Sequence, residues 1–148
     1  MRKYLGQMKS FASSLFINKS LGARALVIQD DKVLLVKHRY TQGWYTIGGA
    51  IDAGETPIEA MQRELREEVG VYCLKAPKLL AVYLNNRENR DDYIIFYLVD
   101  KFEKKTVRSL EILEEQWFDL SQLPADISPA TLRRIEEYRG QRIIAERW

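Results

Sequence analysis

The stretch from Gly49 to Val71, GAIDAGETPIEAMQRELREEVGV, contains the signals of a loop, a short helix and a helix stop. Thr56 is a candidate N-cap, Pro57 suits the first helical position, and Glu59 stands where a capping-box partner belongs. Gly70 stands where a left-handed residue commonly ends a helix. Together these signals predict a helix over residues 57–69.

The predicted helix has an apolar stripe and an acidic arc. At about 100° per residue, one face gathers a stripe that can dock on a sheet, made of Ile58, Met61, Leu65 and Val69. Glu64, Glu67 and Glu68 lie on an adjacent arc at spacing i, i+3 and i+4. Arg63 and Arg66 are predicted to point elsewhere, so a hard divalent cation is the simplest neutraliser of the arc. A solvated acidic helix face is the alternative, because Glu is a good helix former.

As a set, these residues resemble the Nudix hydrolase signature, in which glycines, glutamates and one arginine recur at fixed spacing. Every fixed position of that signature is met, by Gly49, Glu55, Arg63, Glu64, Leu65, Glu67, Glu68, Gly70 and Val71. The preceding residues 44–49 resemble the family's Trp-any-Leu-Pro-Gly-Gly segment, except that Thr46 and Ile47 replace Leu and Pro. This departure bears on the stiffness of the loop more than on its chemistry.

The resemblance implies a hydrolase that cleaves the pyrophosphate linkage of a nucleoside diphosphate joined to another moiety, with Mg²⁺ or Mn²⁺ as cofactor. The implied metal ligands are Glu64, Glu67, Glu68 and the carbonyl of Gly49. We interpret Glu55 and Arg63 as a pair that holds the loop against the helix. A further ligand or general base is expected after the signature, and rough alignment with the family selects Glu111, with Glu114 and Glu115 as substitutes. Which carboxylate accepts a proton stays open.

The resemblance also implies an α/β (α+β) fold, a sandwich in which a mixed sheet is covered by the signature helix and by a C-terminal helix. The residues alone predict strands over 21–28, 32–37, 78–84 and 93–99, and a last short strand that contains Trp117 and Phe118. A final helix is predicted from Ser128 and Pro129 to about Arg139. Its expected buried face consists of Leu132, Ile135 and Tyr138.

Three arginines are candidate substrate contacts. Arg39 follows a predicted strand that leads into the metal-binding loop, and a guanidinium group suits bidentate contact with phosphate oxygens. The polar segment over 85–92 is predicted to be a hairpin tip in which Arg87 or Arg90 contacts a phosphate and an Asn contacts a base or sugar, with a solvated hairpin end as the alternative. His38, the only histidine, is interpreted as a structural or surface residue.

With 148 residues, of which 46% are hydrophobic, the chain suits one domain over 21–148, preceded by a basic amphipathic arm over 1–20. The arm is expected to pack on the domain or on a second subunit in a homodimer, and an organellar presequence or a membrane-surface helix is the alternative. No apolar run is long enough for a transmembrane helix. The single cysteine, Cys73, fits a reducing compartment, so a cytoplasmic location is expected.

The net charge of +2 provides no global basic field, so the expected partner is a small nucleoside diphosphate derivative and nucleic acid is not favoured. An RNA 5′-end pyrophosphohydrolase stays open, because a basic path for RNA could come from Arg133, Arg134, Arg139, Arg142 and Arg147. A non-catalytic nucleotide-binding module also stays open, although such proteins commonly lose signature glutamates. Markers of individual subfamilies are missing downstream of the signature, so the sequence does not specify the substrate.

Overall fold

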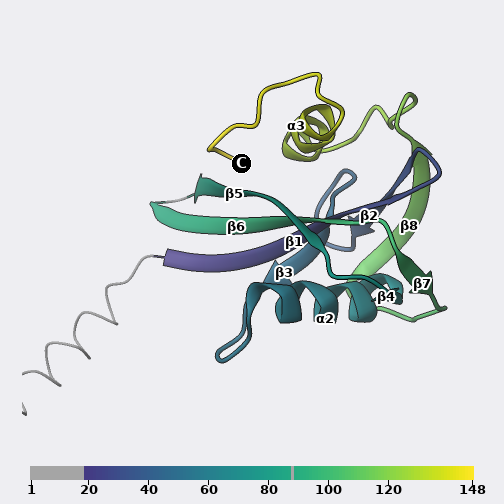
Figure 1. The fold of residues 1–148 in the computed structure, drawn as a ribbon, viewed down its shortest axis with the longest axis horizontal. Coiled ribbons are helices and arrows are strands. Elements are labelled where there is room, and N and C mark those ends of the chain that lie inside the picture. Colours follow the sequence, from purple (N-terminus) through teal and green to yellow (C-terminus); the bar gives the residue numbers. More distant parts are fainter. Residues whose placement is uncertain (1–18, 88) are drawn as a thin grey trace, which may run out of the picture.

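The computed structural model describes residues 19–87 and 89–148. In this part of the chain a mixed sheet lies between two helices, α2 (Pro57–Val69) and α3 (Pro129–Tyr138), which cover opposite faces (Figure 1). The predicted sandwich is therefore confirmed. The predicted arm over 1–20 lies outside the described residues except for its last two, which begin the first strand, and the division at residue 20 stays a prediction.

Strand β1 (Lys19–Gln29) forms the centre of the sheet. The strand order is β5 (Lys78–Arg87), β6 (Arg90–Val99), β1, β2 (Lys32–His38) and β8 (Ile112–Asp119), with β3 (Ile47–Ala50) paired to β1. β1 runs parallel to β6 and antiparallel to both β2 and β3. A separate two-stranded sheet consists of β4 (Val71–Cys73) and β7 (Phe102–Lys104).

The alternation of side chains along β1 divides the interior into two cores, because neighbouring residues of a strand point to opposite faces of a sheet. Ala23 and Val27 belong to the core under α2, together with Leu65. Leu26 belongs to the core under α3, together with Ile135. Both helices are therefore held by burial of apolar side chains against the same central strand.

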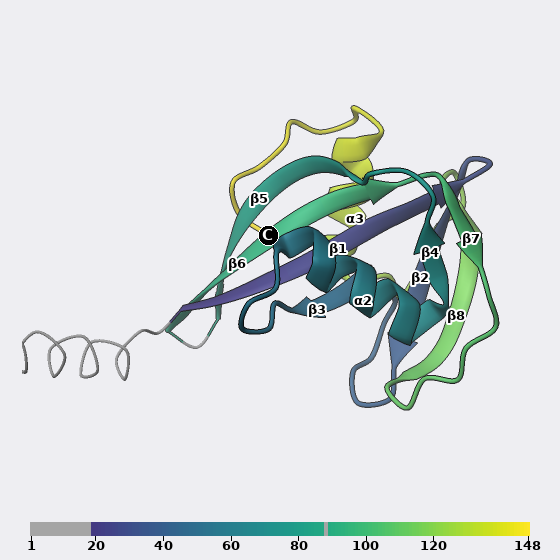
Figure 2. The same cartoon turned by 60° about the horizontal axis from the view of Figure 1, so that its bottom comes forward.

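Helix α2 has the predicted bounds and caps. The Thr56 hydroxyl accepts from the amide of Glu59, whose carboxylate in turn accepts from the amide of Thr56, and Gly70 ends the helix at φ 66°. Three members of the predicted stripe are buried, whereas Ile58 at the first turn is 37% exposed. Figure 2 shows this helix lying across one face of the sheet beside β3. Among the described residues, no helix is long and apolar enough to cross a membrane.

The predicted hairpin tip over 85–92 was wrong in its bounds. Strand β5 continues to Arg87 and β6 already begins at Arg90. As a result, Asn85 and Asp92 are strand residues that pair with each other across the antiparallel ladder. Polar composition misled the prediction, because these strand ends border a polar cavity instead of an apolar core.

The predicted buried face of α3 was correct for Ile135, which is 1% exposed, and wrong for Tyr138. Tyr138 is 38% exposed, whereas Arg134 and Glu137 are 1% and 8% exposed. The two buried charges form a salt bridge of 2.8 Å, and Tyr83 donates to the same carboxylate at 2.6 Å. Charged residues at spacing i, i+3 can be buried together when each satisfies the other, and a rule based on apolar periodicity overlooks such a pair.

Candidate active site

Arg63 holds the loop before α2 against the helix. Its guanidinium group donates to both carboxylate oxygens of Glu55, at 2.7 and 2.9 Å, and to the carbonyl of Ala50 at 3.0 Å. The hydrogen bonds from Arg63 and from the amide of Asp52 lower the pKa of Glu55 to about 2. The interpreted pair of Glu55 and Arg63 is therefore present. However, Arg63 was predicted to point away from the acidic arc, and this was wrong, because it also donates to Glu64 Oε1 at 2.6 Å.

Glu64 lies directly against the end of β3. A methyl group built on Gly49 would come within 2.6 Å of Glu64 Oε1, so only glycine leaves room for this carboxylate. Burial raises the pKa of Glu64 although the hydrogen bond from Arg63 lowers it, and the charges of Glu67 and Glu111 raise it further. The carboxylates of the signature therefore repel one another across a short distance.

Glu68 is buried, and its predicted place on an exposed arc was wrong. The residue is 5% exposed, and its carboxylate accepts a hydrogen bond from the backbone of Gly48. Oε2 of the same carboxylate is buried without a hydrogen-bond partner in the described structure. Desolvation and the charge of Glu64 raise the pKa of Glu68 to about 8. A buried carboxylate oxygen without a partner is costly, so this atom is a candidate ligand for a cation.

Glu111 approaches the acidic arc from the segment before β8. Its charge raises the pKa of both Glu64 and Glu68, which places the three carboxylates within electrostatic reach of one another. Nevertheless, no three His, Cys, Asp or Glu side chains of the described residues converge into a ready metal site. Repulsion among the carboxylates and the salt bridge from Arg63 to Glu64 account for the separation of these side chains.

The donor set fits a hard divalent cation. Carboxylate and carbonyl oxygens are the ligands that Mg²⁺ and Mn²⁺ prefer. The unpartnered Glu68 Oε2 supplies a buried negative oxygen, and the close approach of Gly49 to Glu64 brings the backbone of β3 beside the carboxylates. Glu67 is exposed and can turn toward an ion from the open side.

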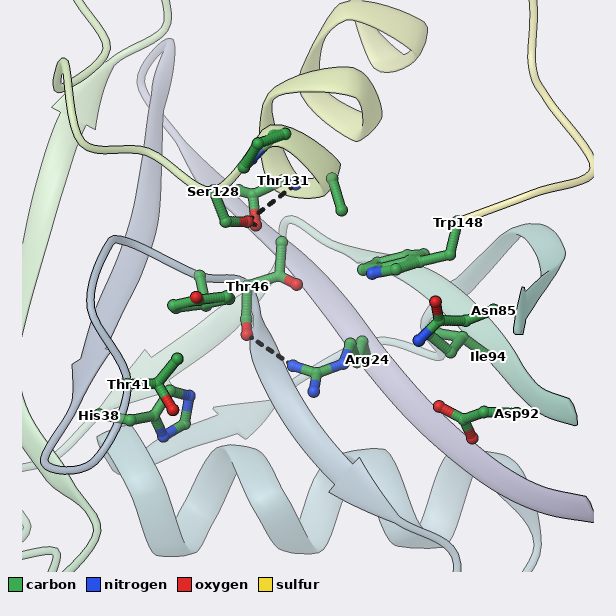
Figure 3. Close-up of a pocket in the computed structure, with 13 residues that line it drawn as sticks. Arg24, His38, Thr41, Thr46, Asn85, Asp92, Ile94, Ser128, Thr131 and Trp148 are labelled. Carbon is green, nitrogen blue, oxygen red and sulfur yellow. Dashed lines mark hydrogen bonds between the residues drawn. The ribbon is translucent and has the colours of Figure 1, made fainter. Parts of the chain in front are cut away.

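A cavity of about 560 Å³ opens on the face of the sheet that carries α3 (Figure 3). Most of its wall is polar, and its lining includes Arg24, His38, Thr46, Asn85, Asp92, Ser128, Thr131 and Trp148. The sequence analysis assigned Ser128 to a helix start, His38 to a structural or surface role and an Asn of the segment over 85–92 to a base or sugar contact, and it gave the others no functional role. The lining residues come from β1, β2, β5, β6, the segment before β3, the start of α3 and the C-terminal segment, so no local pattern could have grouped them.

Arg24 connects the cavity with the carboxylate cluster. Its guanidinium group donates to the carbonyl of Thr46 at 3.1 Å, within the cavity wall (Figure 3). The same positive charge lowers the pKa of Glu68. Burial and the charge of Arg24 lower the pKa of His38, which favours a neutral imidazole there. The cavity wall and the carboxylates are thus linked through the charge of Arg24.

Of the three predicted substrate arginines, Arg39 and Arg90 do not line the cavity. Arg39 donates to the carbonyl of Leu110 at 2.8 Å and its amide donates to the carbonyl of Glu111, so it fixes the segment that carries Glu111. Arg90 is exposed at the start of β6, two residues before Asp92. The side chain of Arg87 lies outside the described part of the structure. Contact of these residues with substrate stays a prediction.

Comparison with known proteins decides the family. The family model described as NUDIX domain matches residues 19–138. The chain belongs to the NUDIX family. It is 30% identical over 115 residues to the ADP-ribose pyrophosphatase of Methanocaldococcus jannaschii, across 74% of this chain and 68% of that protein. It is 33% identical over 108 residues to a probable DHNTP pyrophosphohydrolase of Lactococcus lactis, across 70% of this chain and 60% of that protein.

Solved structures agree with this membership. The crystal structure of a MutT NUDIX hydrolase from Burkholderia pseudomallei matches with a TM-score of 0.71 at 26% identity, over 80% of this chain and 96% of that chain. The predicted NUDIX resemblance is confirmed, and so is the predicted class of enzyme, a hydrolase that acts on phosphorus anhydrides.

Two neighbouring glycines of this NUDIX domain allow stability and activity to be separated. Gly48 has φ +146°, and a methyl group there would collide with the backbone of Ala23, so Gly48→Ala should lower the melting temperature strongly. In Gly49→Ala the methyl group meets the flexible Glu64 side chain, so the fold should persist while turnover falls at least about tenfold, a loss of about 1.4 kcal/mol. Thermal unfolding and steady-state kinetics of both variants check this expectation. Equal turnover in Gly49→Ala and wild type would contradict it.

Proposed function

We propose that this protein uses Mg²⁺ or Mn²⁺ to hydrolyse the pyrophosphate linkage of a nucleoside diphosphate joined to another moiety. The observation that carries the proposal is the buried carboxylate of Glu68, which has an oxygen without a partner and lies within electrostatic reach of Glu64 and of Arg24, a residue of the cavity wall. Cation-binding oxygens within electrostatic reach of a polar cavity suit a substrate that combines negative charge with a neutral ring system.

In this proposal Glu64, Glu67, Glu68 and the Gly49 carbonyl hold the cation. When bound, the ion would screen the negative charge of the diphosphate and make water more acidic. Arg63 orients Glu64 through its 2.6 Å hydrogen bond, and its bonds to Glu55 fix the loop that precedes the helix. Glu111 faces the cluster from another segment and is our candidate for the base that accepts the proton of the attacking water.

The nucleoside half of the substrate is assigned to the cavity. Arg24, at the junction of cavity and carboxylates, is suited to contact a phosphate between the two. The relatives are named for ADP-ribose and for DHNTP, so the comparisons support the chemical class and leave the individual substrate open. Location and oligomeric state stay predictions.

A screen of nucleotides tests the proposal. Purified protein with Mg²⁺ or Mn²⁺ would be offered ADP-ribose, nucleotide sugars, dinucleoside polyphosphates and nucleoside triphosphates, with release of phosphate, pyrophosphate or nucleoside monophosphate as the readout. We expect hydrolysis of at least one class. Binding of nucleotides without hydrolysis of any of them would instead favour the non-catalytic module.

Three of the five arginines proposed as a path for RNA are engaged within the fold. Arg134 is 1% exposed, and Arg139 donates to the carbonyl of Leu120 at 2.8 Å. Arg133 donates to the carbonyl of Trp148 at 2.9 Å. Because these side chains serve internal contacts, the structure offers little support for an RNA 5′-end activity.

Arg90→Ala should raise KM for the best substrate while changing kcat less. The side chain lies at the end of the hairpin whose second pair inward, Asn85 and Asp92, lines the cavity. A lost charge-assisted contact with phosphate corresponds to about a tenfold rise in KM. Lys101→Ala, which removes an exposed cation just beyond the other end of β6, serves as the control. An unchanged KM in Arg90→Ala would identify the tip as a solvated hairpin end.

A further inference from the structure

The segment that follows α3 returns across the sheet and pairs with β5. The amide of Leu84 donates to the carbonyl of Glu146 at 2.8 Å, and the amide of Trp148 donates to the carbonyl of Leu84 at 3.1 Å. Figure 1 shows this segment passing over β5 after it leaves α3. Its backbone is therefore fixed like a short added strand, and the direction of the Trp148 side chain is fixed with it.

The indole of Trp148 enters the cavity from this segment. Figure 3 shows the ring extending over Asn85, with Asp92 beyond it. On the side of the core the ring makes edge contacts with Tyr83 and Phe96, at centroid distances of 5.4 and 5.5 Å. The remaining indole surface forms part of the cavity wall, so a flat aromatic surface and two polar side chains border one space.

A buried polar network holds this wall in place. The guanidinium carbon of Arg134 lies 4.0 Å from the centroid of the Tyr83 ring and 5.1 Å from that of Trp148. Arg134 also donates to Glu137 at 2.8 Å and to the carbonyl of Arg147 at 3.3 Å. Glu137 in turn accepts from the amide of Ala145 at 3.0 Å. The network thus joins α3 to the segment over 145–148 at several points.

We propose that Trp148 stacks on the nucleobase of the substrate and that Arg134 is a positioning residue which holds Trp148 in the cavity wall. Asn85 and Asp92 supply hydrogen-bonding groups for the edge of the same base. The inference rests on the proposed function, since it assigns a residue to the nucleoside half of that substrate. Stacking on an aromatic side chain accepts any nucleobase, because every base has a π face. The carboxylate of Asp92 would select among bases, because it accepts hydrogen bonds and therefore favours a base edge with N–H donors.

The surroundings of Trp148 favour stacking on a ligand over a purely structural role. Trp148 lines the cavity and is only partly buried, so part of its indole surface faces the space that a ligand would fill. Asp92 Oδ1 accepts from the Ser20 hydroxyl at 2.8 Å, which fixes the carboxylate and leaves Oδ2 as a further acceptor. Side chains that are already fixed around an aromatic surface lose little conformational entropy when a ligand binds, so the cost of binding is smaller.

Steady-state kinetics of the full chain test the proposal, with the best nucleotide substrate from the screen. Trp148→Ala should raise KM about 5- to 150-fold, as expected for the loss of one stacked base, and should change kcat by less than about twofold. Trp148→Phe should recover most of the affinity. Trp117→Phe serves as the matched control, because Trp117 stacks on Phe102 away from the cavity. Arg134→Lys should raise KM although the charge is kept, because Lys cannot reproduce the planar stack.

Inhibition constants separate stacking from a general loss of cavity shape. A nucleoside monophosphate should lose affinity for Trp148→Ala by the same factor as the substrate, whereas ribose 5-phosphate, which has no base, should bind both proteins equally. Quenching of tryptophan fluorescence by the monophosphate should be present in wild type and largely lost in Trp148→Phe. This second measurement remains informative if Trp148→Ala folds poorly, because the Phe variant keeps an aromatic ring in the core.

Three results would overturn the inference. These are an unchanged KM in Trp148→Ala, an equal loss of affinity for ribose 5-phosphate, and equal fluorescence quenching in wild type and Trp148→Phe. All three leave the proposed function standing, because wild type still turns over its substrate. The proposed function fails in a different way, when the wild-type protein hydrolyses none of the nucleotides in the screen.

Discussion

Glu68→Gln should lower kcat by about a hundredfold or more, a loss of at least about 2.7 kcal/mol of transition-state stabilisation. Gln is nearly isosteric and can keep the hydrogen bond from Gly48, but it removes the negative oxygen that we assign to the cation. The substitution should leave the folded structure and its stability intact. Burial already raises the pKa of Glu68 to about 8, so the metal-free fold favours the neutral form of this side chain. Circular dichroism and turnover should therefore diverge, and the melting temperature of the metal-free variant should equal or exceed that of wild type.

Glu67→Gln should lower kcat in the same manner, although Glu67 is exposed. Glu59→Gln is the matched control, because it makes the same chemical change on the same helix and Gln also suits a capping box. Its kinetics should match those of wild type. If Glu68→Gln or Glu67→Gln keeps more than about a tenth of the wild-type kcat, a loss under about 1.4 kcal/mol, its assignment as an essential ligand is wrong.

Chelation of divalent cations should abolish hydrolysis, and millimolar Mg²⁺ should raise the melting temperature even without substrate. The shift should grow with pH. The folded-state pKa of Glu68, about 8, exceeds its ordinary value of 4.5, so the metal-free fold loses stability as pH rises from about 4.5 through about 8. A cation offsets the charge that appears on the buried carboxylate. The stabilisation by Mg²⁺ should therefore be larger near pH 8.5 than near pH 6.

Thermal unfolding with and without Mg²⁺, at both pH values, measures this effect. Glu64→Gln should weaken the shift, and Glu59→Gln should leave it intact. Mn²⁺ should replace Mg²⁺, whereas the all-oxygen donor set gives Zn²⁺ no dedicated site. Hydrolysis at an undiminished rate after chelation would refute the metal-centred account and leave the acidic arc as a structural feature of the helix.

Helix α2 was predictable because its signals are local. Thr56, Pro57 and Gly70 act within one turn of the helix ends, and the structure places both ends as predicted. The burial of Glu68 was not predictable in this way. It depends on the approach of Gly48, which lies twenty residues earlier on another element, and a helical projection contains no information about such a neighbour.

Strand β3 and the cavity were missed for related reasons. β3 contains two adjacent glycines, Gly48 and Gly49, which have low β propensity. Gly48 is needed for close approach to the backbone of β1, and Gly49 is needed for close approach to Glu64 of α2. The cavity gathers Arg24 from β1 and Trp148 from the end of the chain. Their proximity follows from the order of strands in the sheet and from the pairing of the last residues with β5. Neither the strand order nor this pairing can be predicted from residue spacing in the sequence.

The place of the carboxylates along α2 has a consequence for the helix itself. Glu64, Glu67 and Glu68 occupy its last two turns, where the aligned peptide dipoles add partial negative charge. Acidic residues destabilise a helix at this end, and Arg66 is the only basic residue of the last turn. Substitutions that make α2 a better isolated helix, such as Lys or Gln in these turns, would also remove its attraction for cations. The helix is thus less stable than a helix of the same length without acidic residues in its last turns, and the proposed cation would relieve this cost, which would be a local trade-off between stability and activity.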